Sequence, residues 1–94
     1  MKNKISLIGL GNWGKNYLRT LSQLDLLRSI YDPKIKDTKL YRERFNIPGS
    51  VIIENSLNSL LSDQKVLACI IASPPKSHYD NLVMCLKSKK HCLV

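Results

Sequence analysis

The chain has 94 residues, which is short for one domain and excludes a second. Hydrophobic residues make up 44% of it and charged residues 23%, as in ordinary soluble globular proteins, and no segment approaches the ~20 apolar residues of a membrane span. Fifteen Lys and Arg residues against seven Asp and Glu residues give a net charge of +8. This excess favours anionic partners such as nucleotide phosphates, nucleic acid or an anionic membrane, or else forms a solvated basic surface.

The three cysteines, Cys69, Cys85 and Cys92, form no CxxC pair. Their odd number and apolar surroundings indicate small buried side chains in a reducing compartment, with neither a disulfide framework nor a zinc site. The opening segment MKNKISLIGLGNWGK has a basic lead, but Gly, Asn and Lys interrupt its apolar run too early for a signal peptide. We therefore expect a cytoplasmic protein without a metal site, and neither a membrane nor nucleic acid as its partner.

Strand and helix patterns alternate along the first half of the chain. Residues 5–8 (ISLI) predict a first strand that runs into glycines. A helix should follow, because apolar side chains recur at helical spacing at Trp13, Tyr17, Leu18, Leu21 and Leu24. Residues 26–32 (LLRSIYD) predict a second strand that closes at Asp32-Pro33, and residues 37–45 a short helix capped by Asp37 or Thr38.

The second half repeats this alternation. Residues 51–53 (VII) predict a third strand, and Ser56 should cap a short helix. The continuous apolar run at 66–72 (VLACIIA) is typical of a central parallel strand covered on both faces. Residues 77–89 predict a helix that begins with a Ser77–Asp80 capping box, ends near the basic residues Lys87, Lys89 and Lys90, and has an apolar face of Tyr79, Leu82, Val83 and Leu86. Residues 92–94 (CLV) would then form a fifth strand.

An order of β-α-β-α-β-α-β-α-β indicates an α/β fold with helices on both faces of a parallel sheet. Right-handed crossovers restrict this to a doubly wound, Rossmann-like sheet, for which we expect the strand order 3-2-1-4-5. A full unit of this kind has two βαβαβ halves. Residues 1–94 contain one half and most of another, so we expect a partial domain that is incomplete at its C-terminus.

The first strand leads into Gly9-Leu10-Gly11-Asn12-Trp13-Gly14, which is a G-x-G-x-x-G motif. Gly9 would allow the tight turn out of the strand, Gly11 the approach of a pyrophosphate to the backbone, and Gly14 close packing of helix against sheet. The helix that follows would direct free N–H groups and its dipole at the phosphates. A glycine-rich turn that binds nothing is the alternative, but the strand before the motif and the helix after it favour dinucleotide binding.

Asp32 follows Gly14 by 18 residues and ends the second strand, where a carboxylate can accept hydrogen bonds from the adenosine ribose. A carboxylate repels a 2′-phosphate, so Asp32 favours NAD over NADP. Lys34 could contact such a phosphate, although it could equally be a solvated loop lysine.

The fourth predicted strand ends in Ala72-Ser73-Pro74-Pro75-Lys76-Ser77-His78. In the order 3-2-1-4-5 this loop faces the glycine motif across the crevice where the strand order reverses. We expect Ser73, Pro74, Pro75 and His78 to line the nicotinamide side of the site. For His78, a neutral surface histidine at a helix start is an equally good interpretation.

The segments GLGNWG, Asp32-Pro33, ASPPKSHYD and KKHCLV together resemble the amino-terminal domain of the Gfo/Idh/MocA oxidoreductases. The resemblance covers the whole chain, and its most specific parts are the Pro-Pro…His loop and the last strand. Ser73 departs from the threonine more common in the family but keeps the hydroxyl. The resemblance implies an NAD(P)-dependent dehydrogenase that acts on a sugar, cyclitol or related hydroxyl compound and is homo-oligomeric when intact.

In the family, the strand that matches HCLV is followed by Glu-Lys-Pro, whose lysine belongs to the active site, and then by a substrate domain. The chain ends one residue before that triplet would begin, so no catalytic residue can be named and we expect the 94 residues alone to be inactive. Two other interpretations stay open: an NAD-sensing regulatory module, for which there is little room, and an inert gene fragment.

Overall fold

A computed structural model describes residues 2–94 of the chain. Its strands are β1 (Ile5–Ile8), β2 (Leu27–Tyr31), β3 (Ile52–Ile53), β4 (Ala68–Ile71) and β5 (His91–Leu93). Its helices are α1 (Asn12–Gln23), α2 (Thr38–Arg44), α3 (Leu57–Ser62) and α4 (Pro75–Lys87). The strands form one parallel sheet in the order β3-β2-β1-β4-β5, as the alternating pattern predicted. In the described residues, no helix is long and apolar enough to span a membrane.

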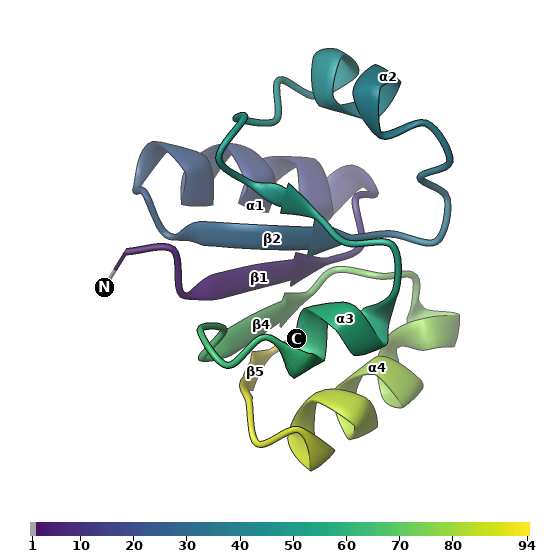
Figure 1. The fold of residues 1–94 in the computed structure, drawn as a ribbon. Helices are drawn as coiled ribbons and strands as arrows, with labels where there is room; N and C mark the ends of the chain where they lie inside the picture. The colour runs from purple at the N-terminus through teal and green to yellow at the C-terminus, as the bar shows by residue number, and fades with distance from the viewer. Residues whose placement is uncertain (1) are drawn as a thin grey trace.

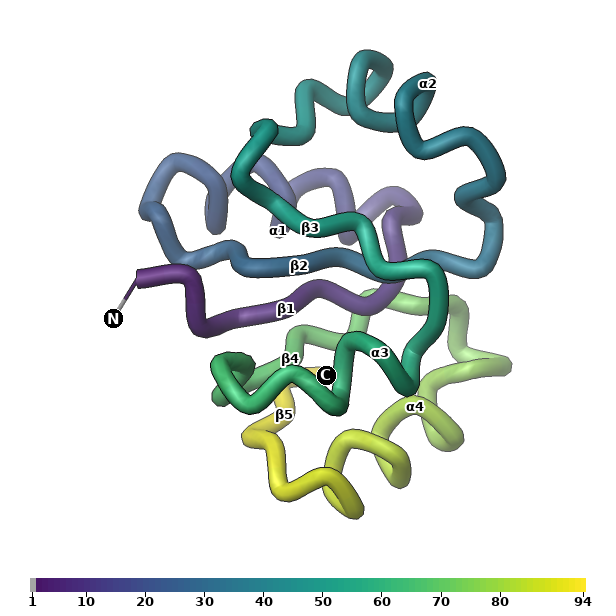
Figure 2. The backbone as a smooth tube through the Cα atoms, in the orientation of Figure 1, coloured from purple at the N-terminus to yellow at the C-terminus, as the bar shows by residue number. Residues whose placement is uncertain are grey.

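The helices cover both faces of the sheet, with α1 and α2 on one side and α3 and α4 on the other (Figure 1). Successive strand residues alternate between the two cores: Leu7 and Ile70 lie in the core under α1, Ile8 and Ile71 in the core under α3 and α4. After β3 the backbone crosses the end of the sheet to the opposite face and returns through α3 to β4 (Figure 2). The strand order therefore reverses between β1 and β4, which is where doubly wound sheets bind their ligands.

A bulge in β2 decides which of its side chains face which core. Ile5 pairs with Leu27, but Ser6 pairs with Ser29, so Arg28 is an extra residue. Leu27 and Ile30 consequently face the core under α1, while Ser29 lies on the other side and meets Ser6 at 2.5 Å between the hydroxyl oxygens. The bulge also makes Arg28 available for an ion pair on the α3 side.

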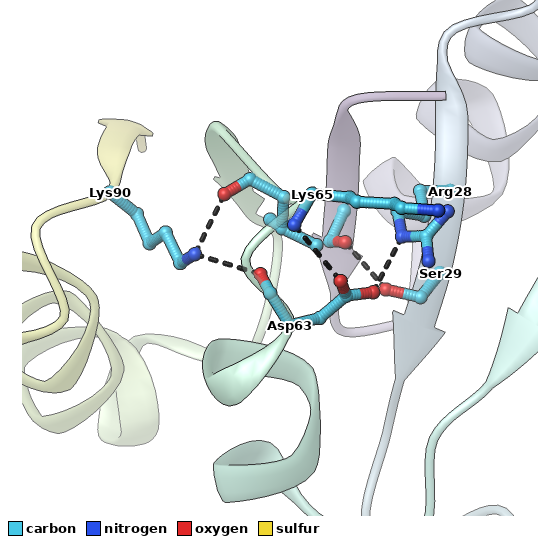
Figure 3. A network of polar contacts seen from close by, with 7 residues as sticks. Arg28, Ser29, Asp63, Lys65 and Lys90 are labelled. Carbon is cyan, nitrogen blue, oxygen red and sulfur yellow. Dashed lines mark hydrogen bonds and ion pairs between the residues drawn. The ribbon is translucent and has the colours of Figure 1, made fainter. Parts of the chain in front are cut away.

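Arg28 belongs to a polar clamp, which we define as Arg28, Asp63 and Lys90, at the amino ends of the strands (Figure 3). Arg28 Nε donates to Asp63 Oδ2 at 2.5 Å, and Lys90 Nζ donates to the carbonyls of Asp63 and Val66 at 2.9 and 2.7 Å. Burial raises the pKa of Asp63, but the hydrogen bonds from Arg28 and the Lys65 N–H, with the charges of Arg28 and Lys90, outweigh it and lower the pKa. The clamp ties β2, α3 and the start of β5 together at the edge opposite the glycine motif.

Several element boundaries differ from those expected. α4 begins at Pro75, which the missing N–H of proline favours at the first helical position, so Ser77 lies inside the helix and the Ser77–Asp80 capping box is wrong. The α4 side chain that packs deepest is Cys85, whereas Tyr79 and Leu86 are 74% and 58% exposed. Lys90, which was predicted to lie near the helix end where the dipole favours cations, lies beyond α4, and its ammonium bonds within the polar clamp. The predicted caps Asp37 and Ser56 are confirmed, since each accepts a backbone N–H of its helix.

Candidate cofactor site

The glycine motif forms the turn between β1 and α1 at the carboxyl edge of the sheet. Gly9 has φ +99°, a conformation that L side chains rarely adopt, and a Cβ there would lie 2.5 Å from the Ser73 nitrogen. Its N–H donates to the Tyr31 carbonyl at 2.8 Å. Gly14, in the first turn of α1, is buried, and a Cβ there would collide with the Gly9 carbonyl oxygen. Both glycines thus allow β1, α1 and the end of β4 to approach closely.

Gly11 differs from the other two glycines, because a Cβ built there meets nothing within 4 Å. Packing within the chain therefore does not require a glycine at position 11. Gly11 is the N-cap of α1, and it has no side chain to accept a hydrogen bond from the first turn of that helix. The exposed Asn12 and Trp13 follow it, and their backbone N–H groups have no acceptor within the helix and lie at the positive end of its dipole.

Asp32 stands beside this turn at the end of β2. Its Oδ2 accepts the Leu10 N–H at 2.8 Å and its Oδ1 accepts the Lys34 N–H at 2.8 Å. The first bond satisfies the amide of a residue whose side chain is buried in the core under α1, so Asp32 also has a structural role. Each carboxylate oxygen can accept more than one hydrogen bond, which leaves Asp32 able to accept from a ligand hydroxyl.

A cavity of about 400 Å³ lies at the same edge, between the start of α1 and the start of α4. The structure brings together at it Trp13, Ser73, Pro75 and His78, all of which were predicted site residues; Tyr17, Ile71, Ala72 and Val94 complete its lining. Pro74 is the exposed N-cap of α4 and is not among the lining residues. A second cavity, of about 290 Å³, opens beside Asp32 at the ends of β2 and β3.

Sequence reasoning missed the residue that positions Ser73. The Ser73 hydroxyl is buried and accepts a hydrogen bond from Asn81 Nδ2 at 2.7 Å, which links the end of β4 to the middle of α4. Asn81 follows His78 by three residues and therefore lies on the same face of the helix. The signal available in the sequence was this polar amide among apolar helix positions, three residues after a predicted site residue.

These residues fit a dinucleotide. The open backbone at Gly11 offers a path for a diphosphate to the helix N-terminus, and the fixed carboxylate of Asp32 offers acceptors for ribose hydroxyls. The cavity lined by Trp13 and His78 would take a flat ring. No group of His, Cys, Asp and Glu in residues 2–94 is arranged to hold a metal ion.

A family model described as "Oxidoreductase family, NAD-binding Rossmann fold", that of Gfo/Idh/MocA, matches residues 3–94. The chain belongs to this family. The resemblance drawn from the glycine motif and the Pro-Pro…His loop is thereby confirmed. Comparison with curated protein sequences found no match.

Solved structures agree with this assignment. A protein from Magnetospirillum magnetotacticum MS-1 assigned to the oxidoreductases is 32% identical, with a TM-score of 0.78 over 100% of this chain and 29% of its own. Myo-inositol dehydrogenase from Lactobacillus casei, in complex with NAD(H) and myo-inositol, is 19% identical, with a TM-score of 0.81 over 98% of this chain and 27% of its own. A protein from Desulfitobacterium hafniense DCB-2, named as an NADPH-dependent oxidoreductase, is 23% identical, with a TM-score of 0.75 over 98% of this chain and 26% of its own. The Gfo/Idh/MocA chain described here thus spans between a quarter and a third of the length of these structures.

Proposed function

We propose that this chain is the NAD(P)-binding part of a Gfo/Idh/MocA dehydrogenase that acts on a sugar, a cyclitol or a related hydroxyl compound. One observation carries the proposal: Gly11 has no packing reason to be glycine, yet it lies where a diphosphate would have to approach the first turn of α1. Membership of an NAD-binding oxidoreductase family supports it.

Each part of the dinucleotide would contact a different group of residues. The backbone of residues 9–14 would hold the pyrophosphate, and Asp32 would accept from the adenosine ribose hydroxyls beside the smaller cavity. Ser73, Pro74, Pro75 and His78 would form the nicotinamide side, with Asn81 fixing the Ser73 hydroxyl. When bound, the dinucleotide supplies the hydride acceptor or donor, and the task of this chain is to orient it and exclude water from one side.

NAD is the better candidate than NADP. Both Asp32 oxygens are held by backbone N–H groups, so the carboxylate cannot swing away from a 2′-phosphate without leaving those donors unpaired. Lys34 is exposed and its backbone N–H donates to Asp32, while its ammonium makes no ion pair within residues 2–94 and could contact a phosphate. The balance between repulsion of a 2′-phosphate by Asp32 and its attraction by Lys34 would set the preference between NAD and NADP.

We propose further that the residues that bind substrate and move its proton lie elsewhere in a longer polypeptide, because the solved relatives are more than three times the length of this chain. The dehydrogenase named for myo-inositol supports a polyol substrate class. Holding substrate against the cofactor can supply roughly 7–11 kcal/mol of the barrier, so the 94 residues alone should not catalyse turnover.

The test compares the chain with a version extended through the downstream sequence of its gene. Both are titrated with NAD and NADP by calorimetry and assayed for NADH formation with a panel of sugars and inositols. The proposal expects both forms to bind NAD and only the extended form to turn over a polyol. Turnover by the short chain at the rate of the long one would assign the chemistry to residues described here as cofactor contacts, with His78 first among them.

A further inference from the structure

A second groove carries a concentration of positive charge that the cofactor site does not use. It is a cavity of about 400 Å³ between α1 and the carboxyl end of α2, and it shares no lining residue with the cavity at the carboxyl edge of the sheet. Lys15 and Arg19 line it from α1 and Arg44 lines it from α2. None of the seven carboxylate residues of the chain is among its lining residues. We call it the α1–α2 groove.

The positions of Lys15 and Arg19 are unfavourable for the chain alone, whereas Arg44 lies in the last turn of α2, where the helix dipole favours a cation. Lys15 lies in the first turn of α1, where the helix dipole disfavours a positive charge. Arg19 follows it by four residues, so two like charges lie next to each other on one helix face. In residues 2–94 the only ion pair between side chains is that of Arg28 and Asp63, at the amino edge of the sheet. The α1–α2 groove therefore holds three charges that no carboxylate in the described chain neutralises.

An aromatic ring keeps two of the cations in place. Lys15 Nζ lies 5.6 Å from the centroid of the Phe45 ring, and the Arg44 guanidinium lies 5.4 Å from it. Tyr41 packs against the same ring at 5.5 Å between centroids. Phe45 thus bridges the two helices and fixes charges that would otherwise separate.

A neutral donor completes the arrangement. The Ser22 hydroxyl oxygen is buried and, alone among buried side-chain polar atoms of the described residues, has no hydrogen-bond partner. Ser22 lines the α1–α2 groove and follows Arg19 by three residues on α1. A buried hydroxyl without a partner is costly, and a rotation of the Ser22 side chain toward an acceptor in the groove would remove that cost.

We propose that the α1–α2 groove binds a small phosphorylated compound, held by Lys15, Arg19, Arg44 and the Ser22 hydroxyl. Guanidinium groups pair with phosphate oxygens through two parallel hydrogen bonds, and three cations match a group that carries two or more negative charges. The volume exceeds the needs of a single ion and lies in the range of pockets for small metabolites. The site is separate from the dinucleotide site and does not rest on it.

The test is a titration of the full chain with inorganic pyrophosphate, followed through backbone amide shifts in NMR. We expect saturable shifts at Ser22, Phe45 and Asn46, whether or not a second set appears at Gly11 and Asn12. Arg19→Gln should weaken the first set by about tenfold. It should not lower the unfolding temperature, because it relieves a like-charge pair. Ser22→Ala should weaken binding to a smaller extent.

Lys87→Gln is the matched control, since it removes one exposed charge from the last turn of α4, away from the α1–α2 groove. It should leave the pyrophosphate affinity within about twofold of the parent. Equal weakening by Lys87→Gln and Arg19→Gln would show general attraction to a basic protein and overturn the proposal. Shifts confined to Gly11 and Asn12, or no saturable shifts at Ser22, would overturn it as well.

Discussion

Replacing Gly11 and Gly14 by alanine should separate a glycine that serves a ligand from one that serves packing. A Cβ at Gly11 meets nothing within 4 Å, and the backbone there, at φ −81° and ψ −155°, suits an L residue. Gly11→Ala should therefore change the free energy of unfolding by no more than about 1 kcal/mol, since the lost N-cap preference and the lower entropy of the unfolded chain offset each other.

The effect of Gly11→Ala on binding should be much larger. The added methyl group would stand between the first turn of α1 and a pyrophosphate and lengthen its hydrogen bonds to the backbone. Each hydrogen bond to a charged group is worth about 1.5–3 kcal/mol. Losing one of them should raise the Kd for NAD by roughly 10- to 150-fold.

Gly14→Ala should instead lower the free energy of unfolding. The new Cβ overlaps the Gly9 carbonyl oxygen, a backbone atom that cannot move without shifting the turn. Overpacking of this kind costs about 1–3 kcal/mol. Gly49 is the matched control, because a Cβ there also meets nothing within 4 Å and Gly49 lies in a loop between α2 and β3.

Calorimetry of NAD binding and urea unfolding of the three variants would check this reasoning. Gly49→Ala should match the parent in both measurements. The reasoning would be refuted if Gly11→Ala bound NAD within twofold of the parent, or if Gly14→Ala left the free energy of unfolding unchanged.

Three further predictions concern single side chains. The parent should bind NAD more tightly than NADP, and Asp32→Ala should reduce that selectivity by about tenfold, or 1.4 kcal/mol; tighter NADP binding by the parent would transfer the role to Lys34. Asp63→Asn should cost about 1 kcal/mol or less at neutral pH. The net effect of the clamp is to lower the folded-state pKa of Asp63, so this stabilisation is present above the ordinary aspartate pKa and lost as the pH falls through the folded-state value. The free energies of unfolding of parent and variant should therefore converge as the pH is lowered. A constant difference down to the lowest pH would contradict the stabilising role of the clamp. Burial, with the neighbouring Cys85, raises the pKa of Cys92 to about 11, so its alkylation by iodoacetamide at neutral pH should be on the order of a hundredfold slower than that of a free cysteine; rapid labelling of the folded chain would show that β5 opens.

The parts of the fold that follow from local rules could be predicted from the sequence. The ISLI strand has the predicted bounds because glycines end it, and Asp37 and Ser56 cap the helices for which their side chains are suited. The apolar run at 66–72 contains β4, although the ladder itself occupies only Ala68–Ile71. Periodicity was less informative at the helix ends, where Trp13 and Leu24 keep the helical spacing but are 72% and 60% exposed.

What could not be predicted depends on contacts between distant segments. The bulge at Arg28 goes with contacts to distant segments, since Arg28 bonds to Asp63, 35 residues away, and Ser29 bonds to Ser6, 23 residues away. Asn81 looks like an ordinary helix residue until the end of β4 brings the Ser73 hydroxyl to it. The Gly-x-Gly-x-x-Gly spacing did predict one such contact, since Gly14 packs against the Gly9 carbonyl, whereas a Cβ at Gly11 meets nothing within 4 Å.

An NMR titration of the full chain with NAD tests most directly whether residues 9–14 bind the cofactor. We predict saturable shifts at the amides of Gly9, Gly11 and Trp13 and at Leu10, whose N–H bonds to Asp32, with weaker shifts at His78. Ser22 and Asn46, in the α1–α2 groove, should move much less. Saturable shifts that avoid residues 9–14, or no shifts at NAD concentrations that saturate the gene-extended protein, would contradict cofactor binding by these residues.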